Sequence, residues 1–449
     1  MTIPGGAASA RPAGRSPAQS VKRPSTPPAQ HDPQHDQQSD LFALCPRGLE
    51  AALATELAAL GASDCRPTGG GVHFRGDRTV AYSANLHSRL ASRVLRTVAQ
   101  RRYRDDDDLY RLARSVDWER LLSADHTLRV DVRARHSPLR SLNFATLRIK
   151  DGIVDRLRDT TGARPSIDTR TPDVRVFAWL EARTAILYVD LSGEPLFKRG
   201  WRAGADDKGE APLKENLAAG LLVLAGWTPQ KALCDPFCGS GTIAIEAAQR
   251  VFGPAPGIAR TFGFERLLDH DPALWRQLRD EAVRHGRETT QAVLALPDRP
   301  SITASDRDRR AIEQARRNML RAGLPEQAID WQVADATRVR APGTKPGWIV
   351  TNPPYGQRIH ARSDRSDRFG TSVESIDRQH EETMRRFGDA LKQAFPGWRL
   401  AMLSSDARLP QSLGMREDRR TPLFNGAIEC RLYGFDIRAA GRGTSAAES

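Results

Sequence analysis

LCDPFCGSGT, residues 233–242, leads directly into the mostly apolar segment IAIEAA, residues 243–248. We expect an apolar strand that ends at Asp235, then a loop of small residues and then a helix. Gly239 and Gly241 have no side chains, so a ligand could approach the backbone of this loop closely. No Lys follows the glycines, which argues against a loop that cradles phosphates. The Asp235 carboxylate would repel a phosphate, whereas it would attract an ammonium group or ribose hydroxyls.

Two further segments end in an acid in the same way. We expect a strand at 301–305 that ends at Asp306, and residues 331–334 lead to Asp335. A helix with one apolar face is expected after Asp306, at 308–322. A single Asp at such a position is more often a helix cap than a ligand contact, so capping is the alternative for each of these acids.

A fourth strand is expected at 348–351, and the sequence Asn352-Pro353-Pro354-Tyr355 follows it. Two prolines cannot continue a sheet, and they hold the backbone rigid just past the strand. This rigidity would hold the Asn352 amide beside the Tyr355 ring. A site that binds a planar ring with an amine group would need both of these groups. The alternative is a turn in which Asn352 caps and Tyr355 packs. Because ligands bind outside the carboxyl ends of strands in an open parallel sheet, we expect the four strand ends to form one site.

The region around these strand ends resembles class I S-adenosylmethionine-dependent methyltransferases that modify exocyclic amines of nucleobases. The resemblance implies an α/β, Rossmann-like domain with a doubly wound, mostly parallel sheet and an antiparallel last strand. It implies that the cofactor S-adenosylmethionine is bound by Asp235, Pro236, Cys238, Gly239, Ser240, Gly241, Thr242, Asp306 and Asp335. Asp235 and the glycine loop would hold the methionine moiety, Asp306 the ribose hydroxyls and Asp335 the adenine amine.

The same resemblance assigns catalysis to Asn352, Pro353, Pro354 and Tyr355. Asn352 and the Pro353 carbonyl would accept hydrogen bonds from the target amine, while Tyr355 stacks on the base. An exocyclic amine is a poor nucleophile because its lone pair is delocalised into the ring. Two acceptors on its hydrogens would favour a pyramidal nitrogen aimed at the sulfonium methyl group. Alignment contributes up to about 7–11 kcal/mol in well-oriented systems, and no metal is required.

The stretch before this domain alternates between strands and helices, which predicts a separate α+β module. Strands near 127–133 and 174–191 should bracket a helix at about 143–159. The stretch resembles the N-terminal region of bacterial 23S ribosomal RNA guanine-N2 methyltransferases, in phrases such as CPRGLE at 45–50 and KDGIVD at 150–155. Members of that family carry a THUMP domain, an RNA-binding module, in this region.

We therefore expect a disordered tail at 1–40, a ferredoxin-like part at 41–79, a THUMP domain at 80–193, a methyltransferase domain at 194–438 and a second disordered tail at 439–449. Some family members carry a second methyltransferase behind this region. Because this sequence ends at Ser449, we expect it to catalyse one modification only.

The chain has 68 Lys and Arg against 55 Asp and Glu residues, a net charge of +13. This excess favours a polyanionic partner, most simply nucleic acid, although a GC-rich genome would also enrich Arg. With the resemblance, it favours 23S ribosomal RNA or a precursor of the large ribosomal subunit. The candidate phosphate contacts are Arg140, Arg148, Lys150 and Lys214. The alternative for each is an ordinary solvated charge.

Cysteine content and hydropathy exclude other classes of protein. The five cysteines are scattered and form no CxxC pair, so neither a zinc site nor a disulfide framework is indicated. No run of about 18 apolar residues is present and the N-terminus has no apolar signal segment, so we expect a cytoplasmic protein without membrane contact.

The main hypothesis is a methyltransferase that modifies the N2 of a guanine in 23S ribosomal RNA. One alternative is an adenine-N6 methyltransferase acting on DNA or RNA, because the motif at 352–355 could hold either amine. The others are a tRNA guanine-N2 methyltransferase and a non-catalytic ribosome-assembly factor that retains the fold.

Overall fold

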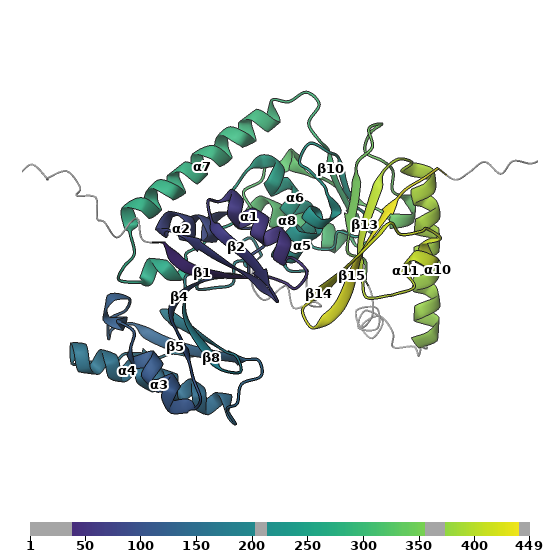
Figure 1. Ribbon diagram of the computed structural model, residues 1–449. Coiled ribbons are helices and arrows are strands. Elements are labelled where there is room, and N and C mark those ends of the chain that lie inside the picture. Colours follow the sequence, from purple (N-terminus) through teal and green to yellow (C-terminus); the bar gives the residue numbers. More distant parts are fainter. Residues whose placement is uncertain (1–37, 203–212, 355–372, 440–449) are drawn as a thin grey trace, which may run out of the picture. The chain divides into compact units, whose positions relative to one another are not determined.

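The computed structural model describes residues 38–202, 213–354 and 373–439, with side chains from residue 378 onward in the last segment. These residues form two sheets (Figure 1). The tails expected at 1–40 and 439–449 lie almost wholly outside the described residues, and so does Tyr355. The first strand already begins at Ser39, inside the expected tail.

The first sheet has eight strands in the order β2-β3-β1-β4-β8-β7-β5-β6. Its strands are β1 (Ser39–Leu44), β2 (Ser63–Thr68), β3 (Gly71–Gly76), β4 (Arg93–Arg102), β5 (Thr127–Ala134), β6 (Ser166–Ile167), β7 (Val174–Leu180) and β8 (Thr184–Asp190). The helices of this part are α1 (Glu50–Ala59), α2 (Arg78–His87), α3 (Asp106–Arg114) and α4 (Leu142–Thr161), with the short 3-10 helix η2 (Trp118–Arg120). The predicted strand near 127–133 and the helix after it are therefore confirmed, and the range 174–191 holds two antiparallel strands, β7 and β8.

Strand β4 joins the two parts that the sequence separated. It pairs with β1 on one side, where Leu41 lies opposite Arg96, and with β8 on the other, where Leu95 lies opposite Asp190. The expected ferredoxin-like part and THUMP region thus share one continuous sheet. A boundary between residues 79 and 80 would divide helix α2.

Local sequence explains where the helices of this part begin and end. The Asp77 carboxylate accepts a hydrogen bond from the Val80 backbone N–H and caps α2. Ser141 caps α4 through the Phe144 N–H, and Gly162 ends that helix in the left-handed conformation, with φ of 78°.

The second sheet has seven strands in the order β11-β10-β9-β12-β13-β15-β14. The strands are β9 (Leu233–Asp235), β10 (Ile302–Asp306), β11 (Asp330–Val333), β12 (Trp348–Thr351), β13 (Arg399–Ser404), β14 (Arg419–Asn425) and β15 (Ile428–Asp436). The helices are α5 (Glu215–Ala225), α6 (Thr242–Phe252), α7 (Pro272–Leu294), α8 (Arg309–Arg321), α10 (Val373–Ala394) and α11 (Leu409–Leu413), with the short 3-10 helices η4 (Gly263–Arg266), η5 (Glu326–Ala328) and η6 (Ala336–Arg338). Strands β9 to β13 pair in parallel, whereas β15 runs antiparallel to β13 and β14. The expected doubly wound, mostly parallel sheet with antiparallel closure is confirmed.

Helices cover both faces of this sheet because its central strands are apolar on both sides. Figure 1 shows α10 and α11 on one face and α6 and α8 on the other. Ile349 packs in the cluster that contains Phe387 of α10, whereas the next residue, Val350, belongs to the cluster that contains Ala244 of α6. Successive side chains of a strand point to opposite faces, so a continuous apolar run fills both layers.

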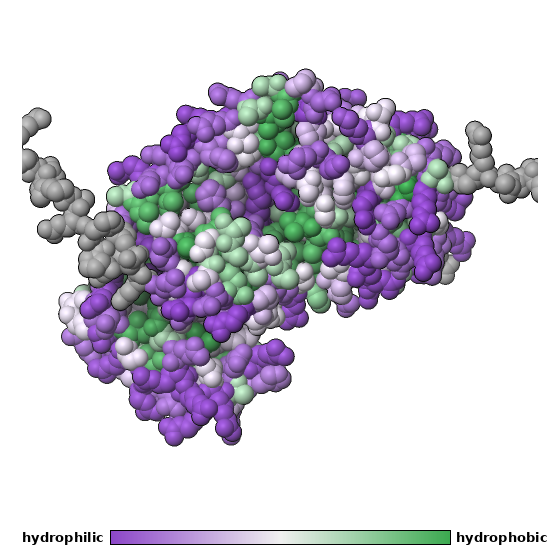
Figure 2. Space-filling view, turned by 45° about the horizontal axis from the view of Figure 1, so that its top comes forward, coloured by the Kyte–Doolittle hydropathy of each residue, from purple (hydrophilic) through white to green (hydrophobic). Residues whose placement is uncertain are grey.

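The face of the described part that Figure 2 shows is mainly hydrophilic. On the face shown in Figure 2, hydrophobic residues form separate patches between hydrophilic ones. Among the described helices, none has the length and apolar character needed to cross a membrane. Within the same residues, no group of three or more His, Cys, Asp or Glu side chains is arranged to hold a metal ion.

Candidate functional site

Four strand ends meet at one edge of the second sheet, as the sequence predicted. Strands β11, β10, β9 and β12 are neighbours in that order, and all four run in parallel. Asp235 and Asp306 end β9 and β10, and Asn352 directly follows β12. Asp335 comes two residues after the end of β11. The polar groups therefore lie along the carboxyl edge of adjacent strands, where ligands bind in such sheets.

Asp235 is the most buried acid of this edge, with only 1% of its surface exposed. Its Oδ1 accepts a hydrogen bond of 2.6 Å from the Thr351 hydroxyl and one of 3.4 Å from the Phe237 backbone N–H. Burial raises the pKa of Asp235 to about 7, and the nearby charge of Asp306 acts in the same direction. The carboxyl group is thus balanced between its neutral and charged forms near neutral pH.

The glycine loop is fastened to the neighbouring strand. The Gly239 N–H donates to Oδ2 of Asp306 at 3.1 Å, and the Cys238 N–H donates to the Ser305 carbonyl at 3.0 Å. Asn318 of α8 donates to the Ser240 carbonyl at 3.1 Å. These bonds hold the loop against β10 and α8.

The two glycines of this loop serve different purposes. Both have positive φ, 52° at Gly239 and 85° at Gly241. A Cβ atom on Gly241 would lie 2.7 Å from the Trp331 ring and 2.9 Å from Cβ of Ala315, so this glycine permits close packing. A Cβ atom on Gly239 would meet no atom within 4 Å, so this position borders open space. Gly239 is therefore the position at which a ligand could approach the backbone.

Neighbouring side chains of the loop are enclosed. Pro236 and Cys238 are buried, and burial together with the charges of Asp235 and Asp306 raises the pKa of the Cys238 thiol well above its ordinary value. Such a thiol stays protonated and packs as a small apolar group. Phe237 lies edge-on to Phe387 of α10, with ring centroids 5.2 Å apart.

The capping alternative can be judged for the two other acids. Asp308, and not Asp306, caps α8 by accepting from the Arg310 N–H at 2.9 Å. Asp306 instead takes the bond from the glycine loop and one from the Asp308 N–H. Asp335 is exposed and does cap η6, because its Oδ1 accepts from the N–H and the hydroxyl of Thr337. These bonds lower the pKa of Asp335, so its carboxylate is charged at neutral pH.

Asn352 has an unusual environment at the end of β12. Its Oδ1 atom is buried and has no hydrogen-bond partner within the described part of the chain. Pro353 is buried beside it and Pro354 is partly exposed. A buried acceptor without a partner is rare in folded proteins and calls for an explanation.

Arg202 and Glu215 extend the site, and the sequence analysis gave them no role. Arg202 donates to Oγ1 of Thr242 at 2.6 Å and to the Leu213 carbonyl at 2.9 Å, and its Nε lies 3.2 Å from Oε1 of Glu215. Glu215 is buried, and burial raises its pKa to about 7.

The four cationic candidates for RNA contact are found in ordinary surface settings. Arg148 donates to Asp107 at 2.5 Å and lies 4.5 Å over the ring of Tyr110. Lys150 lies 2.8 Å from Asp151. Arg140 is exposed just before α4, and Lys214 is exposed before α5 with its Nζ 4.8 Å over the ring of Phe197. Arg148 and Lys150 are two positions apart on α4, a spacing that does not place side chains on one face.

Three family models match the chain. Residues 199–434 match the model described as RMKL-like, methyltransferase domain. Residues 40–95 match the RlmL ferredoxin-like domain, and residues 103–190 match the THUMP domain.

The chain is also similar to curated proteins named ribosomal RNA large subunit methyltransferase K/L. It is 39% identical to the protein from Cellvibrio japonicus over 403 residues, and this match covers 88% of this chain and 51% of that protein. Identity to the protein from Syntrophotalea carbinolica is 40% over 403 residues, which covers 88% of this chain and 53% of that protein. The chain thus spans about half the length of these relatives.

Two solved structures share the fold over most of the chain. One is SMU.472, described as a putative methyltransferase complexed with SAH, with 28% identity, a TM-score of 0.76 and coverage of 90% of this chain and 100% of the other. The second, from Listeria monocytogenes, is described as a predicted N6-adenine-specific DNA methylase. It has 28% identity and a TM-score of 0.76, and the match covers 90% of this chain and 97% of the other.

Proposed function

Because the chain belongs to the family of RMKL-like methyltransferase domains, we propose that it transfers a methyl group from S-adenosylmethionine to the N2 of a guanine in 23S ribosomal RNA. The name shared by the curated relatives supports ribosomal RNA of the large subunit as the substrate. The THUMP match at 103–190 supports an RNA partner, either free or within a precursor of the large subunit. A ribosomal RNA substrate would place the protein in the cytoplasm.

The carboxyl edge of the second sheet fits the cofactor. S-adenosylmethionine supplies a methyl group on a positively charged sulfur, and it carries an ammonium group, two ribose hydroxyls and an adenine amine. Asp235, Asp306 and Asp335 offer carboxylate oxygens to those donors, in the order of their strands. The open space at Gly239 leaves room beside the loop. The complex of SMU.472 with SAH supports this assignment.

The observation that carries the proposal is the buried, unpartnered Oδ1 atom of Asn352. Leaving a buried acceptor without a partner costs about 1–3 kcal/mol, which a donor on the substrate would offset. An exocyclic amine has two hydrogens, so Asn352 and the Pro353 carbonyl could each accept one. The nitrogen lone pair would then be free to attack the methyl carbon, while the C–S bond breaks and a proton leaves the amine. A stacking role for Tyr355 remains a prediction.

Radiolabelled S-adenosylmethionine with separate RNA and DNA substrates tests the proposal. The purified protein is incubated with unmodified 23S ribosomal RNA, large-subunit precursors, tRNA or DNA, and the products are digested to nucleosides for mass spectrometry. We expect N2-methylguanosine from the ribosomal substrates. Label in N6-methyladenine with none in N2-methylguanosine would overturn the guanine assignment in favour of the adenine alternative.

Asn352→Ala separates an enzyme from an assembly factor that only retains the fold. We expect the variant to bind S-adenosylmethionine normally, because the acids at 235, 306 and 335 are unchanged, and to lose methyl transfer by about 100-fold or more. In cells that carry only this variant, the ribosomal RNA position that the wild-type protein methylates should then be unmethylated. Normal methylation in those cells would favour the non-catalytic alternative.

A further inference from the structure

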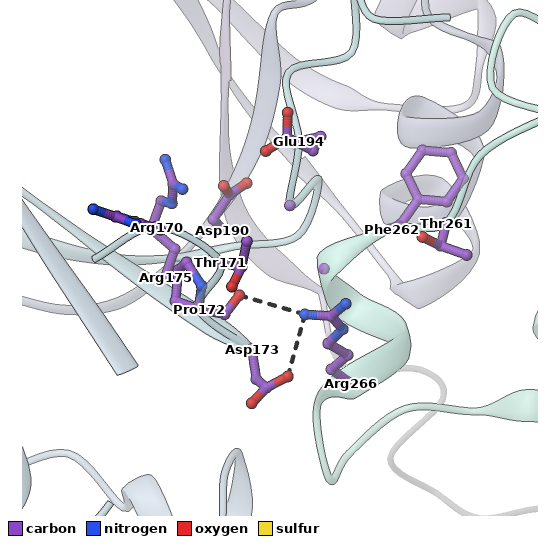
Figure 3. A pocket seen from close by; sticks show the side chains of 12 residues that line it. Arg170, Thr171, Pro172, Asp173, Arg175, Asp190, Glu194, Thr261, Phe262 and Arg266 are labelled. Carbon is purple, nitrogen blue, oxygen red and sulfur yellow. Dashed lines mark hydrogen bonds and ion pairs between the residues drawn. The ribbon is translucent and has the colours of Figure 1, made fainter. Parts of the chain in front are cut away.

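A cavity of about 170 Å³ lies where the end of β8 meets η4 (Figure 3), and no residue of the glycine loop lines it. It is lined by the loop 170–173 before β7, by Arg175 of β7, by Asp190, Gly193 and Glu194 at the end of β8, and by residues 261–263 and 266 around η4. The β7 and β8 residues fall in the THUMP match, whereas those around η4 fall in the methyltransferase match. One cavity thus brings together side chains from both regions.

The acids of this cavity already have cationic or hydrogen-bonding partners. The buried Asp190 pairs with Arg93, and Glu194 pairs with Lys198. Asp173 accepts bonds from the N–H and the hydroxyl of Thr127, at 2.9 and 2.7 Å. It also pairs with Arg266 across the cavity at 3.2 Å, as the dashed line in Figure 3 shows.

Two arginines of the cavity lack a comparable partner. Arg175 keeps only 16% of its side chain exposed, and the one carboxylate within 4.0 Å of it in the described residues is Asp131, at 3.9 Å. Asp131 already accepts two shorter bonds from Arg129, at 3.0 and 2.7 Å. Arg170 is exposed at the rim and makes no ion pair with any described residue. Figure 3 shows Arg170 and Arg175 on one side of the cavity and Arg266 on the other.

The side chains that line the cavity carry no net charge, because Arg170, Arg175 and Arg266 match Asp173, Asp190 and Glu194 in number. The three acids already form ion pairs, with Arg266, Arg93 and Lys198 respectively, whereas Arg170 makes none with any described residue. Burial and the neighbouring guanidinium of Arg93 lower the pKa of Arg175, while the carboxylates of Asp131 and Asp190 partly offset the repulsion between the two guanidinium groups. A bound anion would offset this repulsion.

We propose that this cavity binds a phosphodiester group of the RNA substrate, with Arg175 at its floor and Arg170 at its rim. The inference rests on the proposed function, because it takes RNA to be the partner. A guanidinium group can donate two parallel hydrogen bonds to a phosphate. Phosphate contacts fix the position of a nucleic acid without reading its sequence. A phosphate held between the two matched regions would set the path of the RNA toward the methyltransferase domain.

The test measures RNA affinity for Arg170→Ala, Arg175→Ala and the double variant, by fluorescence anisotropy with a labelled 23S ribosomal RNA fragment at several salt concentrations. We expect each single variant to weaken binding by about tenfold. The slope of log affinity against log salt should fall by about 1 in the double variant, because one phosphate contact is lost. In methylation assays the KM for RNA should rise, while kcat and the KM for S-adenosylmethionine stay unchanged.

Two variants, Arg175→Lys and Arg284→Ala, serve as controls. Arg175→Lys keeps the charge without the planar fork, so the salt slope should be retained while affinity falls partly. Arg284→Ala removes an exposed arginine of α7 outside the cavity and should leave affinity unchanged. Arg170→Ala removes an exposed side chain without an ion pair, so its effect cannot come from unfolding; the melting temperature of every variant is measured alongside.

The outcomes distinguish this proposal from the proposed function. Wild-type affinity and salt slope in the double variant would overturn the phosphate site, even where methylation of RNA proceeds. RNA binding by the wild-type protein without any methyl transfer would instead overturn the proposed function. Inorganic phosphate is tested separately by thermal shift. A phosphate-dependent shift that Arg175→Ala abolishes, with RNA affinity unchanged, would mean that the cavity binds a free anion and would overturn the RNA assignment.

Discussion

The Thr351 hydroxyl donates a hydrogen bond of 2.6 Å to the buried carboxylate of Asp235. Thr351 is the last residue of β12 and immediately precedes Asn352, whereas Asp235 is the last residue of β9. The bond therefore connects the acid proposed to hold the cofactor with the turn proposed to hold the target base. It favours the charged form of Asp235, while burial opposes that form and leaves the pKa at about 7.

Thr351→Val should weaken cofactor binding in a pH-dependent way. Loss of the hydroxyl removes a hydrogen bond to the charged carboxylate, so the pKa of Asp235 should rise further above 7. At neutral pH we expect the KM for S-adenosylmethionine to rise by about tenfold, and raising the pH should restore part of the loss because Asp235 then ionises. The measurement is KM from pH 6 to 9. Thr351→Ser keeps the donor and should behave like the wild type, and an unchanged pH profile for the valine variant would contradict the prediction.

Asp235→Asn should make the stability of the protein less dependent on pH. The pKa of Asp235 in the folded protein is about 7, above its ordinary value of 3.8, so the folded state holds this proton more tightly than the unfolded state. The resulting stability is fully present below pH 3.8 and is lost as the pH rises through 7. We expect the melting temperature of the wild type to fall from pH 5 to 8 and that of the variant to fall less. Parallel curves for the two proteins would contradict this.

Alanine substitutions at the two loop glycines should have different effects. Gly241→Ala combines a positive φ with atoms of Trp331 and Ala315 less than 3.0 Å from the new Cβ, so we expect loss of stability by about 1–3 kcal/mol or more. Gly239→Ala meets no neighbouring atom and should cost only about 1–2 kcal/mol from its positive φ. If the cofactor lies in the open space at Gly239, then Gly239→Ala should lower the affinity for S-adenosylmethionine more than Gly241→Ala does, when each loss is compared with the fall in melting temperature that the same substitution causes. Calorimetry of unfolding and of cofactor binding measures both.

The strands that form the site could be predicted because each is a short apolar run with an abrupt polar end. β9, β10 and β12 are largely buried on both faces, and up to Asp235, Asp306 and Asn352 they contain only apolar residues and small hydroxyl residues, Thr303 and Ser305 in β10 and Thr351 in β12. Helix α4 was predictable from its apolar spacing. By contrast, β2 reads SDCRPT, is mostly exposed and lies at the edge of its sheet, so its sequence has no apolar alternation.

Contacts that depend on strand order could not be predicted. Thr351 and Asp235 are 116 positions apart and meet only because β12 lies next to β9 in the sheet. Sequence also could not decide which of two close acids caps α8, and the structure gives that role to Asp308 and leaves Asp306 to the glycine loop. Strand β4 was not predicted because its sequence, RVLRTVAQRR, is largely polar. It forms a strand because it pairs with β1 on one side and with β8 on the other.

Glu246→Gln should destabilise the fold without touching the candidate site. Glu246 of α6 is fully buried and lies 3.2 Å from Nε of Arg199 and 3.7 Å from Nη1 of Arg89. The glutamine keeps the shape but leaves two enclosed guanidinium groups without a carboxylate, a loss of about 3–5 kcal/mol for a buried pair. We expect the melting temperature to fall by several degrees. The KM for S-adenosylmethionine, measured well below the melting temperature, should stay unchanged. Lys345→Ala is the matched control, because it breaks an ion pair whose two side chains are each 86% exposed and should leave the melting temperature unchanged. Equal melting temperatures for Glu246→Gln and the wild type would show that this buried cluster contributes little to stability.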